Sequence, residues 1–234
     1  MPKPKNQRMD KAIVIALIGL AGTVITGLLS SPILKALIEK TPVPATATSV
    51  GGGETLVFEN DFEDGESTGF SFSSEEWQVK KEKGNYALEV SGTGNNTTLV
   101  WFGPNDFSDG SIEFRILFKN FDGFLLNFRS TIDAETYTMY FAPESREVKL
   151  GYGSVAHGWE LESFQSGLQS HDFSENTWYD VKLEAAGESI TLWISGNKIL
   201  STFDSRLRKG SMEFAVQYDG TILLDDVKVW ELGQ

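Results

Sequence analysis

The chain has 234 residues, of which 40% are hydrophobic, 12% aromatic and 23% charged, and it contains no cysteine. This length allows one domain of ordinary size with a tail. Disulfide scaffolds, thiolate metal sites and cysteine nucleophiles are excluded. With only two histidines in the chain, His157 and His171, a multi-histidine metal site is not expected.

Charge divides the chain into a basic start and an acidic remainder. Residues 1–50 hold six Lys or Arg against two Asp or Glu, a net charge of +4. The remaining residues carry 14 basic and 31 acidic side chains, a net charge of −17. Such an acidic surface repels phosphate backbones, so the sequence predicts no nucleic-acid partner. Cations, neutral sugars and basic partners are compatible with it.

The first element in chain order is an uncharged, apolar run of 23 residues, 12–34, which follows the basic residues Lys3, Lys5, Arg8 and Lys11. As a helix it would be about 34 Å long, enough to cross a hydrocarbon core of about 30 Å. The basic flank predicts a cytoplasmic tail (1–11), a transmembrane helix (12–34) and an extracellular remainder of a single-pass cell-membrane protein. A cleaved signal peptide is the alternative, because Ala45-Thr46-Ala47 resembles a cleavage site, although the apolar run is longer than a signal core.

A linker, 35–53, is predicted next, because it ends in the stretch TPVPATATSVGGG. Proline, small residues and a glycine triplet cannot bury enough apolar surface to fold. The folded domain is therefore expected to span 54–234.

That domain is predicted to be all-β. Short runs alternate apolar and polar residues, with Gly, Asn and Asp between them, which is the pattern of an antiparallel sandwich. The clearest runs are Ser111–Lys119, Phe124–Arg129, Tyr137–Phe141, Trp178–Glu184, Ile190–Ser195, Met212–Tyr218 and Ile222–Trp230. Two stacked sheets would bury the apolar sides of these runs against each other.

Short motifs near the two ends of the domain indicate a family. The domain opens with NDFEDG (60–65), and its C-terminal half contains WYDVKLE (178–184), ITLWISGNK (190–198), GSMEF (210–214) and LDDVKV (224–229). This order resembles the concanavalin A-like lectin/glucanase superfamily, particularly laminin G-like and DUF1080-type jelly rolls. The resemblance implies a jelly-roll β-sandwich of two antiparallel sheets that often binds carbohydrate, sometimes with calcium, and in some branches hydrolyses glycosides.

Catalysis is not expected. Glycoside hydrolysis needs two carboxylates beside the sugar bond. The glucanase branch supplies them as Glu-x-Asp-x-x-Glu, which this chain does not contain, and the nearest approach, Asp133-Ala134-Glu135, lies in a predicted turn. The DUF1080-type branch expects a histidine-bearing site beside the glutamine of the strand after Gly210, and here Gln217 is followed by Tyr-Asp-Gly.

Six residues are candidates for binding carbohydrate on the open face of the sandwich: Trp193, Tyr140, Arg115, Arg129, Asn127 and Gln217. Ile190, Leu192 and Ile194 can fill the core, which leaves Trp193 outside, where its ring can stack on the apolar side of a sugar. The alternative is that a loop or a neighbouring strand packs over Trp193. The two arginines can instead pair with surface carboxylates.

Four residues are candidates for a structural calcium site: Glu59, Asp61 and Glu63 of the first strand and Asp225 of the last. The resemblance implies that these two strands lie side by side, and calcium takes six to eight oxygen ligands. Asp225 shares the apolar side of its strand with Leu223 and Val227 if the alternation is regular, and a carboxylate there needs a cation or hydrogen bonds. The alternative is that Asp225 accepts hydrogen bonds from backbone amides of the N-terminal loop.

The predicted function is therefore that of a membrane-anchored extracellular carbohydrate-binding module. A protein-interaction or adhesion domain with a cell-surface protein as partner, and a structural subunit of a membrane complex, are the alternatives. A DUF1080-type hydrolase is the least favoured.

Overall fold

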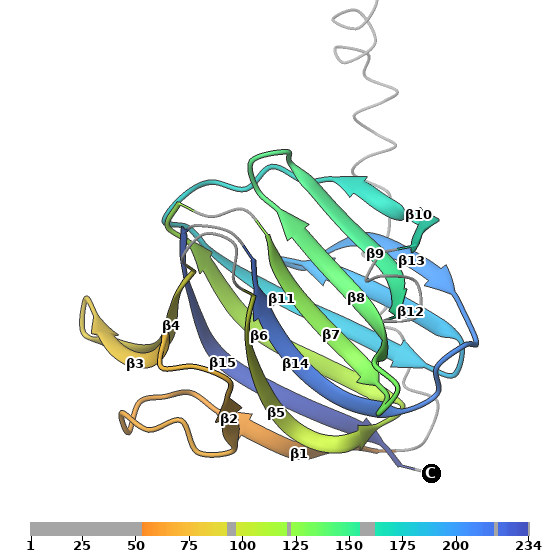
Figure 1. The fold of residues 1–234 in the computed structure, drawn as a ribbon, viewed down its shortest axis with the longest axis horizontal. Coiled ribbons are helices and arrows are strands. Elements are labelled where there is room, and N and C mark those ends of the chain that lie inside the picture. Colours follow the sequence, from red (N-terminus) through yellow and green to blue (C-terminus); the bar gives the residue numbers. More distant parts are fainter. Residues whose placement is uncertain (1–52, 93–96, 121–122, 155–161, 218–219, 234) are drawn as a thin grey trace, which may run out of the picture. The chain divides into compact units, whose positions relative to one another are not determined.

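The computed structural model describes residues 53–92, 97–120, 123–154, 162–217 and 220–233. These residues form fifteen strands and no helix, arranged as two antiparallel sheets (Figure 1), so the predicted all-β sandwich is confirmed. The predicted tail, transmembrane helix and nearly all of the linker lie outside the described residues, as does His157. Within the described ranges, no helix is long and apolar enough to cross a membrane.

Sheet A has the strand order β13-β12-β11-β6-β15-β4-β3, with β1 also paired to β15. Its strands are β1 (Glu54–Asn60), β3 (Trp77–Glu82), β4 (Asn85–Gly92), β6 (Gly110–Phe118), β11 (Trp178–Ala186), β12 (Ser189–Ile194), β13 (Asn197–Phe203) and β15 (Gly220–Leu232). Sheet B has the order β10-β9-β8-β7-β14-β5-β2. Its strands are β2 (Phe70–Phe72), β5 (Thr98–Phe107), β7 (Phe124–Ser130), β8 (Glu135–Ala142), β9 (Glu147–Ser154), β10 (Glu162–Ser170) and β14 (Gly210–Val216).

All seven runs predicted from alternation are strands, with ends shifted by a few residues. Their apolar positions fill the space between the sheets, as Ile112, Phe114 and Ile116 of β6 do. Phe214 and Phe102 are both in sheet B, and their ring centroids lie 4.2 Å apart. The centroid of Phe214 also lies 5.1 Å from that of Phe114, which belongs to sheet A. Aromatic packing across the two layers therefore forms the centre of the core.

The last strand, β15, is paired along both of its edges. Its first part pairs with β4 and its second part with β1, and the change falls at Asp225 and Asp226, where φ of Asp226 is 50°. The first and last strands are thus neighbours, as predicted. The backbone N–H of Gly233 also donates to the carbonyl of Gly53 at 3.4 Å, so the two ends of the domain meet.

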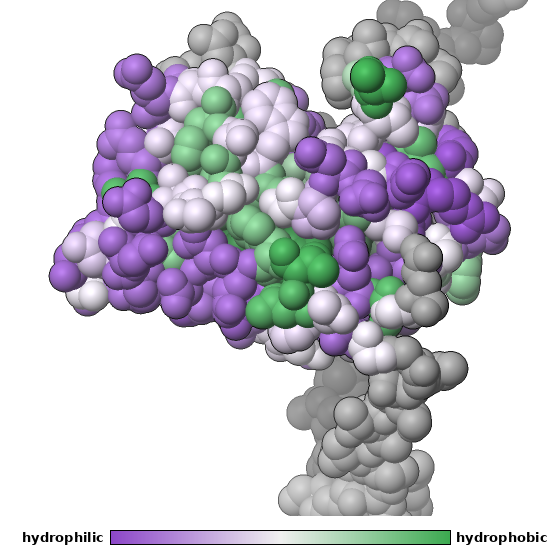
Figure 2. Space-filling view, turned by 90° about the horizontal axis from the view of Figure 1, so that it is seen from below, coloured by the Kyte–Doolittle hydropathy of each residue, from purple (hydrophilic) through white to green (hydrophobic). Residues whose placement is uncertain are grey.

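The face seen from below carries both hydrophilic and apolar residues (Figure 2). In the view from below, hydrophilic residues cover the side that carries β3 and β4, and apolar residues gather near the middle (Figure 2). β1 runs along this lower edge (Figure 1), and its Leu56 and Val57 are exposed.

Arg129 departs from the predicted alternation. Its side chain is 0% exposed. Its φ of 53° lies in the left-handed region, so the regular alternation of side chains between the two faces of the strand is interrupted here. The guanidinium donates to the carbonyls of Ser108 (2.6 and 2.9 Å), Gly187 (3.0 Å) and Leu207 (3.2 Å) and pairs with Asp109 (3.0 Å). The prediction that Arg129 lies on an open face is therefore wrong: this side chain fastens three loops to the sandwich.

Candidate functional site

The predicted carbohydrate-binding residues lie on two different surfaces. Trp193 and Arg115 are on the outer face of sheet A, whereas Tyr140 and Asn127 are on the outer face of sheet B and Gln217 follows β14 of that sheet. The prediction that one open face carries all of these residues is therefore wrong. Alternation separates the inner from the outer side of each strand, but it does not say which of the two sheets the strand joins.

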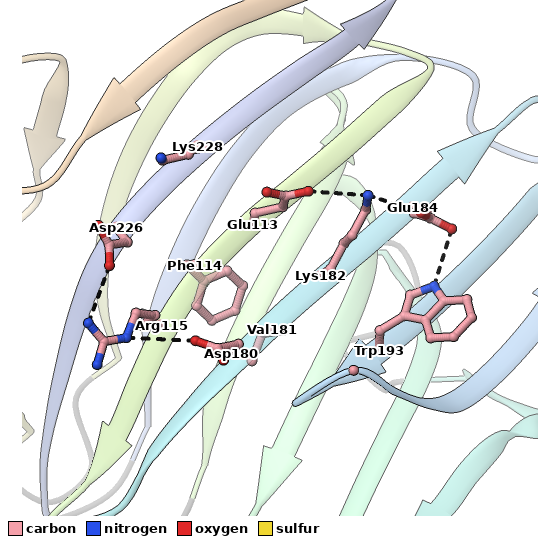
Figure 3. A pocket seen from close by; sticks show the side chains of 11 residues that line it. Glu113, Phe114, Arg115, Asp180, Val181, Lys182, Glu184, Trp193, Asp226 and Lys228 are labelled. Atoms are coloured by element: carbon pink, nitrogen blue, oxygen red, sulfur yellow. Dashed lines mark hydrogen bonds and ion pairs between the residues drawn. The ribbon is translucent and has the colours of Figure 1, made fainter. Parts of the chain in front are cut away.

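The outer face of sheet A contains a depression lined by residues of β6, β11, β12 and β15 (Figure 3). Register places Lys228, Glu113, Lys182 and Trp193 in one row across these four strands. Arg115 and Asp180 are opposite each other at the next outward position. Neighbouring outward side chains can interact across strands, so the row brings opposite charges together.

Every cation that lines this depression is paired with a carboxylate, and Figure 3 shows the pairs of Lys182 and Arg115. Lys182 lies 3.2 Å from Glu113 and 3.1 Å from Glu184. Burial by itself lowers the pKa of Lys182, but its hydrogen bonds to Glu184 and Glu113 outweigh burial and raise that pKa above its ordinary value. Arg115 pairs with Asp180, Asp225 and Asp226 at 3.7, 3.5 and 3.3 Å, and Lys228 pairs with Glu59 at 2.9 Å. The lining therefore combines apolar side chains with charged ones, and each of its cations is held by at least one carboxylate.

Trp193 is held at the edge of this depression. Its indole N–H donates to the Glu184 carboxylate at 3.2 Å, and the Lys198 ammonium lies 6.0 Å from its ring centroid. The side chain remains partly exposed, so neighbouring strands do not cover it completely. The hydrogen bond fixes the orientation of the ring. A second tryptophan on this face, Trp178, is instead stacked under the Arg115 guanidinium at 4.8 Å.

The four predicted calcium ligands do not come together. Glu59 pairs with Lys228 at 2.9 Å, Asp61 accepts the backbone N–H of Glu63, and Glu63 accepts that of Tyr86. No group of three or more acidic or histidine side chains that could hold a metal ion is found in the described part of the chain.

Asp225 lies on the outer face of sheet A, not on the apolar inner side. The irregularity in β15 after Asp225 shifts the alternation, so Val227 and Val229 face the core while Asp225 faces outward. Its carboxylate is nevertheless buried, and it accepts hydrogen bonds from the Asn85 amide and the Asp226 backbone N–H, both at 2.8 Å. These donors are a side-chain amide on β4 and the backbone of the next residue, so the predicted bonding of Asp225 to backbone amides of the N-terminal loop is wrong.

Burial raises the pKa of Asp225 above its ordinary value of 3.8, and hydrogen bonds from Asn85 and Asp226 offset this only in part. The native state then binds the proton more tightly than the unfolded state does. The resulting stability is complete below the unfolded pKa and is lost as the pH rises through the raised native pKa. We therefore compare the free energy of unfolding of the wild type with that of Asp225→Asn in urea titrations. As the pH is lowered from about 7 to about 4, the wild type should become more stable relative to the variant. A pH-independent difference would contradict this expectation.

The outer face of sheet B has a different character. Register aligns Trp101 of β5, Glu213 of β14, Asn127 of β7 and Thr138 of β8 in one row. The Thr138 hydroxyl donates to the Asn127 carbonyl at 2.7 Å, and the Asn127 amide donates to Glu213 at 2.7 Å. Burial raises the pKa of Glu213, and hydrogen bonds from Asn127 and Trp101 lower it by less. Trp101 is 36% exposed beside this carboxylate.

Sequence reasoning missed Glu213, although a signal was present. Glu213 lies between Met212 and Phe214, both buried, so alternation alone places its carboxylate on the outer side. The other predicted residues of this sheet lie around the row. Asn127 is in it, and Tyr140 is one outward position further along β8, with the Lys149 ammonium 6.0 Å from its ring centroid. Gln217 follows β14 and donates its backbone N–H to Gly123 at 3.1 Å.

Comparison with known proteins found no matching family model and no similar curated protein. Solved structures do resemble the chain. A carbohydrate-binding module, CBM66, from Bacillus subtilis matches with a TM-score of 0.53 at 19% identity, over 68% of this chain and 94% of that one. A Bacillus subtilis protein with a galectin-like fold matches with a TM-score of 0.58 at 15% identity, over 78% and 100%. The laminarinase catalytic domain of Thermotoga maritima matches with a TM-score of 0.56 at 11% identity, over 77% and 99%.

These likenesses establish the fold. The strand order and the similar structures are those of a jelly-roll β-sandwich of two antiparallel sheets, which is the fold that the sequence predicted. Because binding modules and a hydrolase domain share this fold, its chemistry has to be argued from the two faces.

Proposed function

We propose that the domain is a non-catalytic carbohydrate-binding module whose site is the depression on the outer face of sheet A. The observation that carries the proposal is the oriented, partly exposed indole of Trp193 beside charges that are already paired. A sugar ring can place its C–H face on the indole, and its hydroxyls can hydrogen-bond to the fixed carboxylates and ammonium group.

The paired cations disfavour an anionic ligand. Lys182 is shared between two carboxylates, and Arg115 lies among three, so an anion finds no unpaired cation in the depression. Neutral hydroxyls, in contrast, can donate to and accept from groups that are already oriented, without breaking an ion pair. The similar structure named as a carbohydrate-binding module supports this proposal at the level of the fold.

Catalysis is not part of the proposal. The carboxylates in the depression, such as Glu113, Glu184 and Asp180, are held by Lys182 and Arg115. Glu135 accepts the hydroxyl of Tyr152 at 2.6 Å, and of the acids spaced two residues apart near β1, Glu59 pairs with Lys228 and Asp61 accepts the backbone N–H of Glu63. Glycoside hydrolysis needs two carboxylates free to flank one bond, and the chain lacks the strand motif that supplies them.

The apolar run 12–34 and the basic residues before it support an anchored, extracellular position for this module. Alkaline extraction of membranes tests this part of the proposal, since a protein without an anchor is released into the supernatant. A cell-surface protein, rather than a glycan, remains the alternative partner of the exposed face.

The sugar site is tested with the full-length protein in detergent on an array of neutral glycans that includes β-1,3-glucan oligosaccharides, with and without calcium. We expect Trp193→Ala to weaken the binding of the best glycan by about tenfold or more, because the stacking surface is lost. Phe203→Ala, an exposed aromatic residue on β13 of the same sheet, is the matched control and should bind as the wild type does. Absence of binding to every glycan, or release of reducing ends from the bound one, would overturn the proposal.

A further inference from the structure

Glu213 is a partly buried carboxylate without a cation beside it. None of the ion pairs among the described residues includes it, and its hydrogen bonds come from two neutral groups, the Asn127 amide and the Trp101 indole. Asn127 is itself oriented by Thr138. The carboxylate is therefore held in a fixed direction by neutral donors, with its charge uncompensated.

The contrast with sheet A is sharp. There, Glu113 and Glu184 share Lys182, and Glu59 pairs with Lys228. On sheet B the nearest lysine in register, Lys149, pairs with Glu147 at 2.7 Å and lies over Tyr140. Placing a carboxylate partly out of water without a counter-ion costs free energy, and a cation brought by a ligand would recover it.

The indole next to Glu213 favours the same kind of ligand. Trp101 is opposite Glu213 in the register and is 36% exposed, and its other cross-strand neighbour, on β2, is the small Ser71. Cations are attracted to the face of an indole ring. The net charge of −17 over residues 51–234 adds a long-range attraction for cations.

We propose that Trp101 and Glu213 form a second binding site, on the outer face of sheet B, for a protonated primary amine. The ammonium group donates to the Glu213 carboxylate, and the carbon skeleton that carries it packs on the Trp101 ring. Amino sugars and lysine side chains both supply this group. The site is independent of the depression around Trp193, because the two lie on opposite outer faces of the sandwich.

The probes are a glucosamine hexamer and its fully N-acetylated counterpart, which has the same backbone without the ammonium groups. Their binding to the full-length protein in detergent is measured by calorimetry at low salt. We expect the glucosamine hexamer to bind at least tenfold more tightly. A lysine-containing peptide and its Nε-acetylated form make a second pair, which identifies the source of the amine. Equal binding within both pairs, or no binding in either, would overturn the proposal.

Two variants locate the site. Glu213→Gln and Trp101→Ala should each weaken the binding of the amine probe by about tenfold or more, provided that thermal melts show folded protein. Glu147→Gln is the matched control, since it removes one negative charge from the same sheet at a carboxylate that already has its lysine. If Glu147→Gln and Glu213→Gln weaken binding equally, the attraction comes from net charge, and the proposed site is wrong. Loss of neutral-glycan binding in Trp193→Ala tests the first site alone.

Discussion

Replacement of Arg129 by methionine is expected to lower the free energy of unfolding by about 3–5 kcal/mol, the range for removing one partner of a buried charged network. Methionine can fill much of the space of the arginine stem, so the loss comes mainly from polar groups. The carbonyls of Ser108, Gly187 and Leu207 lose their donor, and Asp109 loses its cation. Each carbonyl belongs to a different connection, so their loss should loosen one end of the sandwich.

Urea titration followed by tryptophan fluorescence measures this loss. Arg208→Met is the matched control, because Arg208 is also paired with a carboxylate, Glu188, at 2.9 Å, but its side chain is 55% exposed. A surface pair of this kind contributes under about 1 kcal/mol. If both variants were equally stable, the buried guanidinium would not be fastening the loops.

Phe214→Ala is expected to destabilise the domain by a similar amount, about 3–5 kcal/mol, because it leaves a cavity at the centre of the core. The Phe214 ring is fully buried, and its centroid lies 4.2, 5.1 and 5.5 Å from those of Phe102, Phe114 and Phe124. Phe114 belongs to the opposite sheet, so the substitution removes contacts both within and between layers.

The control for this substitution is Phe203→Ala, which deletes the same atoms from a side chain that is 77% exposed. Its effect should stay within about 0.5 kcal/mol, as for most surface substitutions. Chemical denaturation of both variants, with the slope of the transition compared, separates loss of packing from a change in the unfolded state. A Phe214→Ala protein as stable as the Phe203→Ala protein would show that the core is packed elsewhere.

The sequence was sufficient for the strands and for the inner side of most of them. Ile190, Leu192 and Ile194 are buried, and Trp193 is outside, as the alternation indicated. Which sheet each strand joins depends on long-range pairing, and alternation carries no information about that choice. Tyr140 and Trp193 were therefore assigned to one face, although they lie on opposite faces.

Backbone irregularities explain the remaining errors. At Arg129 and Asp226 a positive φ interrupts the two-residue period, so residues beyond the interruption change side. Neither residue is a glycine. Aspartate is enriched at positive φ, which is a weak signal at Asp226, but the residue type gives no such signal at Arg129. The position of Asp225 could not be derived from this weak signal, whereas Glu213 lies in a regular stretch and could have been found.

Because Gly53 and Gly233 are hydrogen-bonded to each other, the first and last residues of the domain lie close enough to be linked. The two ends could be joined directly and the chain reopened at the fully exposed Ile132, between β7 and β8. Every strand pairing would be kept, and only the loop between these two strands would be cut. Exposed turns of this kind are where circular permutation succeeds. The same geometry suits insertion into a surface loop of another protein, since the host chain would leave and return at one point.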